Sequence, residues 1–185
     1  GITIYPDDAE EETTLLRNAD MAMYHAKESG RNTYRYYTGS MNEKMLERLR
    51  LEKDLHRAIE ENELFLEYQP VIDPVHNQVI GAEALVRWMH PQHGRLGPDQ
   101  FIGIAEETGL ISQLGDWVLD RALQELSHWH GEDCAELYVA VNVSSAQRLL
   151  GFSAEKVLQS LKKAKVPAQF LILEITESLL IDQSK

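Results

Sequence analysis

Two periodicities of apolar residues divide the first part of the chain into strands and a helix. Residues 1–6 and 33–37 are rich in β-branched and aromatic side chains, which is typical of strands. Between them, apolar residues recur at helical spacing from Leu15 to Ala26, and Gly30 supplies a left-handed residue of the kind that commonly ends a helix. The pattern therefore predicts strand, helix, strand, which is the tail of an α/β domain.

A long second helix is predicted up to residue 62, because residues 41–62 contain neither proline nor glycine. Ser40 and Glu43 have the spacing of a capping box, so we expect this helix to begin at Ser40. Thr13 or Thr14 is expected to cap the helix before it. The long helix either bridges two domains or packs as the first helix of the second domain, and the pattern leaves both interpretations open.

Strands and helices then alternate to the end of the chain. We expect Pro70 to end the first of these strands and Pro98 to open the first helix. Because strands that alternate with helices form parallel βα units, the pattern predicts a largely buried sheet. The expected strands span residues 64–69, 79–87, 137–143 and 170–176, and the expected helices span residues 98–108, 112–129 and 153–165.

Composition narrows the class of protein. The 185 residues are 43% hydrophobic and 26% charged, values of an ordinary globular chain. A formal net charge of −12 argues against a nucleic-acid polymer as partner, so an anionic ligand must be met by a few placed arginines and lysines or by metal ions. The single cysteine, Cys134, cannot form an intrachain disulfide, which favours a reduced cytoplasmic setting.

The ends of the chain and its apolar runs bear on its context. No run approaches the roughly 20 residues that span a membrane, so we expect no membrane contact within this segment. Both ends interrupt predicted strands or closely follow one, which indicates a window onto a longer protein. That parent protein could be anchored to a membrane through regions before residue 1.

Three strands carry a polar residue where a buried strand normally has an apolar one. These residues are Glu83, Asn142 and Glu174, and each comes late in its expected strand. In α/β sheets and barrels the carboxyl ends of strands form the edge where ligands bind. Two carboxylates and an amide oxygen there could coordinate a hard cation such as Mg²⁺, Mn²⁺ or Ca²⁺. The alternative is that each residue is separately hydrogen-bonded or paired with an arginine.

Two further charged residues lie close to these three in the sequence. Arg87 follows Glu83 by four residues, an even step that places both side chains on one face of a regular strand. Arg87 either grips a phosphate or forms an ion pair with Glu83, and the pattern favours neither. Glu177 follows Glu174 by three residues and either orients a loop or a ligand or is an acidic residue at a helix N-terminus.

The run from Glu83 to Trp88, which reads Glu-Ala-Leu-Val-Arg-Trp, resembles the name-giving motif of the EAL family of cyclic di-GMP phosphodiesterases. The resemblance extends from about residue 48 to residue 181. It implies a modified TIM barrel in which the first strand, residues 64–69, runs antiparallel to the others. Further matches are Tyr68-Gln69-Pro70, His90-Pro91, Ala105-Glu106, Gly109-Leu110-Ile111, Val141-Asn142-Val143-Ser144 and Leu173-Glu174-Ile175-Thr176-Glu177-Ser178.

The resemblance also implies an activity: hydrolysis of cyclic di-GMP to linear pGpG with two Mg²⁺ or Mn²⁺ ions. Glu177 matches a glutamate that steadies a catalytic loop. The implied metal ligands are Glu83, Asn142 and Glu174, the implied catalytic residues are Glu83, Glu174 and Glu177, and the implied substrate contacts are Arg87, Gln69 and Leu85.

The first 38 residues resemble the carboxyl-terminal end of a GGDEF (diguanylate cyclase) domain, which implies a nucleotidyl-cyclase-like α/β fold. Lys27 and Arg31 match positions that hold GTP phosphates, and their spacing of four places them on one helix face. They are equally consistent with ordinary favourable charge at a helix carboxyl end. The matches include Gly1-Ile2, Tyr5-Pro6, Ala22-Met23-Tyr24 and Gly30-Arg31-Asn32.

The resulting expectation is an α/β chain in three parts: the end of a GGDEF domain (1–38), a helical linker (39–61) and the amino-terminal half of an EAL barrel (62–185). A complete barrel takes about 250 residues, so we expect the segment alone to be inactive. Three functions stay open. They are a phosphodiesterase segment, a catalytically silent cyclic di-GMP receptor, and a structural relay of signals through a homodimer.

Overall fold

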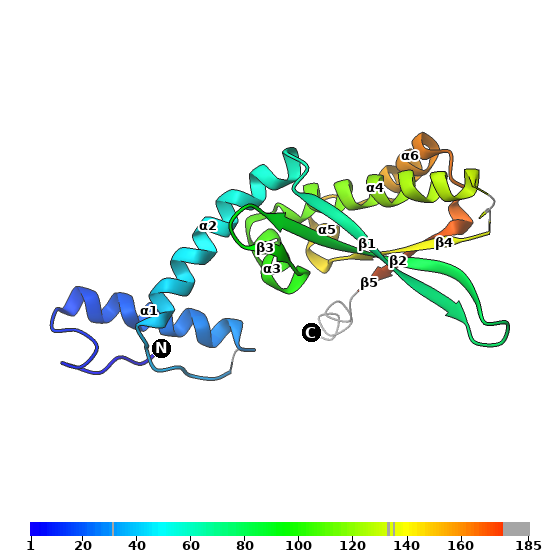
Figure 1. The fold of residues 1–185 in the computed structure, drawn as a ribbon. Coiled ribbons are helices and arrows are strands. Elements are labelled where there is room, and N and C mark those ends of the chain that lie inside the picture. Colours follow the sequence, from blue (N-terminus) through cyan, green and yellow to red (C-terminus); the bar gives the residue numbers. More distant parts are fainter. Residues whose placement is uncertain (31, 133, 135, 176–185) are drawn as a thin grey trace, which may run out of the picture. The chain divides into compact units, whose positions relative to one another are not determined.

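The computed structural model describes residues 1–30, 32–132, 134 and 136–175 (Figure 1). The chain divides into two compact units, Gly1–Leu51 and Glu52–Lys185. The division falls within helix α2, Ser40–Glu60, which begins at the predicted Ser40. Among the described residues, none of the helices has the length and apolar character needed to cross a membrane.

The first unit is built around helix α1, Glu12–Glu28. Gly30 adopts φ of 101°, in agreement with the predicted helix stop. The predicted cap at Thr13 or Thr14 is wrong, because the extended residue before the helix is Glu11. The carbonyl of Glu11 already accepts the amide of Leu15, so the helix starts earlier than the threonines.

The two strands expected in the first unit reduce to one parallel bridge between Ile2 and Tyr36. The Ile2 amide donates to the Arg35 carbonyl at 2.9 Å, and the Tyr37 amide donates to the Ile2 carbonyl at 2.8 Å. The ladder does not lengthen because the Ile4 amide donates to the Asp8 carboxylate instead. Pro6, two residues further on, has no amide hydrogen to donate.

The second unit contains one mixed sheet with strand order β1-β2-β4-β5 and with β3 paired to β2. β1 is antiparallel to β2, whereas β2–β4 and β4–β5 are parallel. The expectation of an antiparallel first strand is therefore confirmed. The strands are β1 (Leu64–Asp73), β2 (Gln78–His90), β3 (Gly94–Leu96), β4 (Tyr138–Val143) and β5 (Leu171–Ile175).

Strand β1 does not end at Pro70, and this prediction is wrong. It continues to Asp73, with Pro70 paired to Ala82 of β2. β1 lies at one end of the described strand order, and proline is tolerated on such an edge strand because the ladder on that side is absent.

Helix α4 lies along one face of the sheet and contacts β1, β2 and β4 (Figure 1). Its buried leucines pack with the buried valines of β4, which form the core. Helix α6 packs against α4, where Lys156 pairs with Asp116 and Lys163 with Asp120. The helices of this unit are α3 (Pro98–Thr108), α4 (Ile111–Gly131), α5 (Ser145–Leu149) and α6 (Ala154–Ala164), with a 3₁₀ turn at Ala168–Phe170.

The far end of β2 is held by polar contacts to the residues around the end of α2. The fully buried Trp88 donates its indole N–H to Glu63 at 3.0 Å. His90, also buried, accepts the amides of Gln92 and His93 at Nδ1, so its proton lies on Nε2 and is donated to Asp54 at 3.2 Å. β2 is thereby held beyond the segment that pairs with β4.

Candidate functional site

The structure brings two of the three predicted metal ligands into contact and places the third beside them. Asn142 of β4 donates a hydrogen bond from Nδ2 to Oε1 of Glu83 of β2 at 2.6 Å. Glu174 of β5 pairs in register with Asn142. Neighbouring residues in register on parallel strands point to the same face of a sheet, so the three side chains share one face.

This face is the one turned away from α4. Tyr68 lines a cavity together with α4 residues, so the next residue of β1, Gln69, points to the opposite face. Gln69 is the register partner of Glu83. Met89 and Ile172 on this face are 52% and 40% exposed, although the small Ala140 beside Ile172 is buried, so the face is open at its larger apolar side chains.

Glu83 lies near the carboxyl-terminal end of the part of β2 that pairs with β4, but not near the end of β2 itself. The pairing of β2 with β4 covers Gly81 to Ala84, and Glu83 lies near the end of that pairing. β2 itself continues to His90 because it is also paired with β1 and β3. The predicted position at a carboxyl-terminal edge therefore holds for the parallel part of the sheet, not for the whole strand.

The donor set of the site fits a hard cation. The amide nitrogen of Asn142 is used on Glu83, so its oxygen is the atom left to face a ligand. With the carboxylates of Glu83 and Glu174 this makes an all-oxygen set, which suits Mg²⁺ or Mn²⁺. No group of three or more His, Cys, Asp or Glu side chains that could hold a metal occurs in the described part of the chain.

Arg87 lies on the same face, but its predicted alternative partner is wrong. Its Nε donates to Oε2 of Glu67 at 2.8 Å, and its Nη1 donates to the Val86 carbonyl at 2.9 Å. The carboxylate that pairs with Arg87 is therefore Glu67 of β1 and not Glu83.

Glu67 binds a second guanidinium, that of Arg95 in β3. Arg95 donates from Nε to Oε1 at 2.8 Å and from Nη2 to Oε2 at 2.5 Å. The hydrogen bond from Arg95 lowers the pKa of Glu67 below its usual value. Burial opposes this effect, and the hydrogen bond from Arg87 lowers the pKa further. Sequence reasoning missed both Glu67 and Arg95. The even step from Glu67 to Gln69 could have indicated the first, whereas Arg95 lies in a hairpin that no periodicity predicted.

The other two predicted substrate contacts, Gln69 and Leu85, lie on β1 and β2. Gln69 pairs with Glu83, and Leu85 pairs with Glu67. Leu85 also lines a cavity of about 240 Å³ together with Asn142 and Ser144, and the hydroxyl of Ser144 hydrogen-bonds to Glu106. The cavity thus adjoins the proposed metal ligands.

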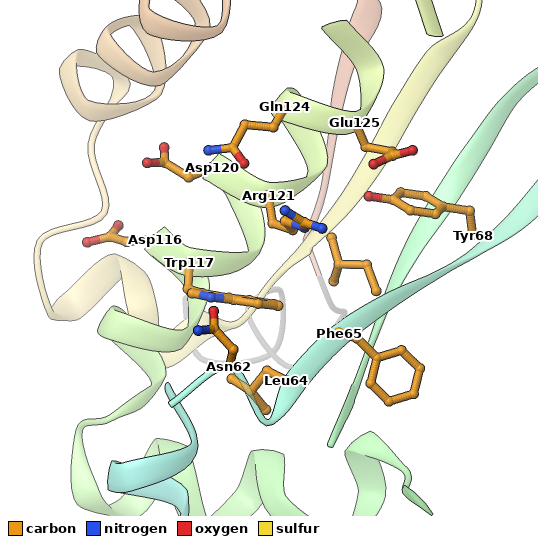
Figure 2. A pocket seen from close by; sticks show the side chains of 11 residues that line it. Asn62, Leu64, Phe65, Tyr68, Asp116, Trp117, Asp120, Arg121, Gln124 and Glu125 are labelled. Carbon is orange, nitrogen blue, oxygen red and sulfur yellow. The ribbon is translucent and has the colours of Figure 1, made fainter. Parts of the chain in front are cut away.

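A larger cavity of about 760 Å³ lies between β1 and α4 (Figure 2). Figure 2 shows Trp117, Arg121 and Glu125 of α4 directed towards β1. Burial raises the pKa of the Tyr68 phenol, which packs edge-on against Trp129 with ring centroids 4.9 Å apart. None of the residues predicted for chemistry lines this cavity, so its size does not make it the site.

Two of the predicted residues, Glu177 and Arg31, lie outside the described residues. Lys27 is an exposed residue of the last turn of α1. The predicted pairing of Lys27 with Arg31 around a phosphate therefore stays a prediction.

Comparisons with known proteins identify the family to which most of the chain belongs. Residues 52–185 match the model of a family described as the EAL domain. The chain is 44% identical over 178 residues to the bifunctional diguanylate cyclase/cyclic di-GMP phosphodiesterase MucR of Pseudomonas aeruginosa, covering 96% of this chain and 26% of MucR. It is 37% identical over 188 residues to the cyclic di-GMP phosphodiesterase PdeR of Escherichia coli, covering all of this chain and 28% of PdeR.

Solved structures show the same fold. A complex of the MucR phosphodiesterase of P. aeruginosa with c-di-GMP superposes with a TM-score of 0.68 at 41% identity, over 71% of this chain and 53% of that one. The FimX EAL domain of P. aeruginosa bound to c-di-GMP gives a TM-score of 0.58 at 28% identity, over 69% of this chain and 50% of that one. The chain spans about a quarter of the length of the curated relatives it matches.

Proposed function

The chain belongs to the EAL domain family, and we propose on this basis that it is part of a cyclic di-GMP signalling protein that cleaves the dinucleotide. In this proposal the complete barrel hydrolyses one phosphodiester bond of cyclic di-GMP to give linear pGpG. The observation that carries it is the contact of Glu83 with Asn142, beside Glu174, on the open face of the sheet. The names of MucR and PdeR, both cyclic di-GMP phosphodiesterases, support it further.

Each residue of the open face has a role in this proposal. Glu83, Asn142 and Glu174 hold Mg²⁺ or Mn²⁺, which when bound supplies an activated water and stabilises developing negative charge. Arg87 keeps N–H donors beyond those used on Glu67 and Val86, and these bind a substrate phosphate.

The other substrate contacts are assigned from the positions of their residues in the sheet. Gln69 pairs with Glu83 and Leu85 lines the smaller cavity, and in this proposal both contact the substrate. Glu177, which lies outside the described residues, steadies a catalytic loop in this proposal.

We assign the rest of the chain by the same reasoning. Residues 1–38 are the end of a GGDEF domain in which Lys27 and Arg31 face GTP phosphates, residues 39–61 are a helical linker, and residues 62–185 are the amino-terminal half of the EAL domain. The match to 96% of this chain by MucR, a protein with both activities in its name, supports the assignment. We place the protein in the cytoplasm and propose that it can form a homodimer.

The test is hydrolysis of cyclic di-GMP by the protein that carries the complete EAL domain, with pGpG separated by chromatography. Turnover in Mg²⁺ or Mn²⁺ that stops on addition of EDTA supports the proposal. Tight binding of cyclic di-GMP without turnover would replace the phosphodiesterase with a receptor. Failure to bind the dinucleotide in the presence of metal would remove both functions.

A further inference from the structure

Glu67 has no part in the function proposed above, yet it is the most heavily committed carboxylate on the open face. It accepts one hydrogen bond from Arg87 and two from Arg95. Its register partner on β2 is Leu85, so Arg87 is its diagonal neighbour on the same face, within reach of long side chains.

The contacts of Arg87 hold its guanidinium at two points. Nε is held by the Glu67 carboxylate, and Nη1 is held by the carbonyl of Val86 in its own strand. A guanidinium carries five N–H groups in a rigid plane, so fixing two of them sets the direction of the others. The side chain is only 13% exposed, so the group is held in place rather than free in solvent.

Arg95 fixes the Glu67 carboxylate and offsets its negative charge beside the proposed phosphate site. Its fork binds both oxygens of Glu67, which fixes the carboxylate plane and keeps it ionised. Together the two guanidiniums carry more positive charge than Glu67 carries negative charge. The carboxylate can therefore hold Arg87 without making the surface repel an anion.

We propose that Glu67 is a positioning residue that aims Arg87 at the substrate phosphate and is itself fixed by Arg95. The inference rests on the function proposed above, because it takes the ligand of Arg87 to be a phosphate of cyclic di-GMP. In this proposal Glu67 acts only through Arg87 and does not itself touch the substrate.

Two substitutions separate positioning from simple charge balance, both made in the protein with the complete EAL domain. Glu67→Gln keeps the length of the side chain and removes the charge, whereas Glu67→Asp keeps the charge and shortens the reach. If Glu67 positions Arg87, both variants raise the KM for cyclic di-GMP about 3- to 10-fold, the scale of one net hydrogen bond, and leave kcat within about 2-fold. If Glu67 only adds negative charge, Glu67→Gln lowers the KM and Glu67→Asp leaves it unchanged, which overturns the proposal.

A double-mutant cycle tests whether the effect runs through Arg87. In an Arg87→Ala background, Glu67→Gln should change kcat/KM, measured below saturation, by less than about 2-fold. The same loss in both backgrounds would overturn the proposal. Asp116→Asn is the matched control, since Asp116 is an exposed carboxylate paired with Lys156 on the helical side, and it should leave KM and kcat unchanged.

Two further measurements are needed: the thermal stability of each variant, and the binding and cleavage of cyclic di-GMP by the wild-type protein. Melting of each variant is measured without ligand, and loss of the folded state in both Glu67 variants would make Glu67 a structural residue and overturn the proposal. A wild-type protein that neither binds nor cleaves cyclic di-GMP refutes the proposed function itself. A wild-type enzyme whose KM is insensitive to both Glu67 variants refutes only the positioning role.

Discussion

Asn142 donates its side-chain amide to the carboxylate of Glu83 over 2.6 Å, although 59 residues separate them in the chain. The contact crosses from β4 to β2, which pair in parallel. Because the amide nitrogen of Asn142 is used in this hydrogen bond, its carbonyl oxygen is the atom available to a cation. The proposed metal site therefore depends on the parallel pairing of two strands that a long helical connection joins.

Replacing Glu83 by alanine should abolish hydrolysis of cyclic di-GMP and leave the fold intact. The carboxylate is proposed to serve the metal, and its removal leaves Asn142 partly exposed to solvent rather than stranded in the core. We expect a loss of at least about 100-fold in kcat, the scale for removal of a principal electrostatic group, with a melting temperature close to wild type. Production of pGpG at the wild-type rate would refute the assignment of Glu83.

Mn²⁺ should stabilise the wild-type protein against unfolding but not a Glu174→Ala variant. A ligand at about 100 times its Kd that binds only the folded state adds about 2.7 kcal/mol. Melting is measured with Mn²⁺ and with EDTA for wild type, Glu174→Ala and the control Asp116→Asn. An equal Mn²⁺ shift in wild type and Glu174→Ala would place the metal elsewhere.

Arg87→Ala should weaken binding of cyclic di-GMP by about 2–3 kcal/mol, the scale of a charge-assisted hydrogen bond. Because Glu67 keeps Arg95 as a partner, the loss of Arg87 leaves no unpaired carboxylate, and ligand-free stability should change little. Affinity by calorimetry and melting in EDTA are measured on the same variant. A large loss of stability with nearly preserved affinity of the folded fraction would contradict the phosphate contact.

Trp88→Phe should lower the free energy of unfolding by about 1–3 kcal/mol. The substitution removes the indole N–H that binds Glu63 and leaves a void where a fully buried ring had packed edge-on against Phe101. Urea unfolding at neutral pH measures the change. A difference below about 0.5 kcal/mol would mean that the contact between β2 and Glu63 contributes little.

Tyr68 should make stability fall at high pH. Burial raises the pKa of its phenol in the folded state, so the unfolded chain releases this proton first as pH rises. Its contribution is fully present below about pH 10, the unfolded value, and is lost as pH rises from there towards the folded pKa. Unfolding free energies from pH 9 to pH 11.5 should decline less steeply in Tyr68→Phe than in wild type. Identical slopes would contradict a raised pKa at Tyr68.

The sequence by itself determined the bounds of the helices whose ends are set by residues next to them in the chain. The predicted helix of residues 98–108 is α3 with the same bounds, because Pro98 opens it and Gly109 closes it in the left-handed conformation. α6 lies within one residue of its prediction, between the Ser153 cap and Lys165. The even spacing of Glu83 and Arg87 likewise placed both on one face, since side-chain alternation is a property of any strand.

Only the tertiary structure decided which residues from distant parts of the chain become neighbours. The partner of Arg87 is Glu67, twenty residues earlier, and that pair follows from the antiparallel register of β1 on β2. The continuation of β1 through Pro70 likewise depends on its edge position in the described sheet. Periodicity gives the face of a side chain but not the register between strands, because register is set by hydrogen bonds and packing between segments far apart in the chain.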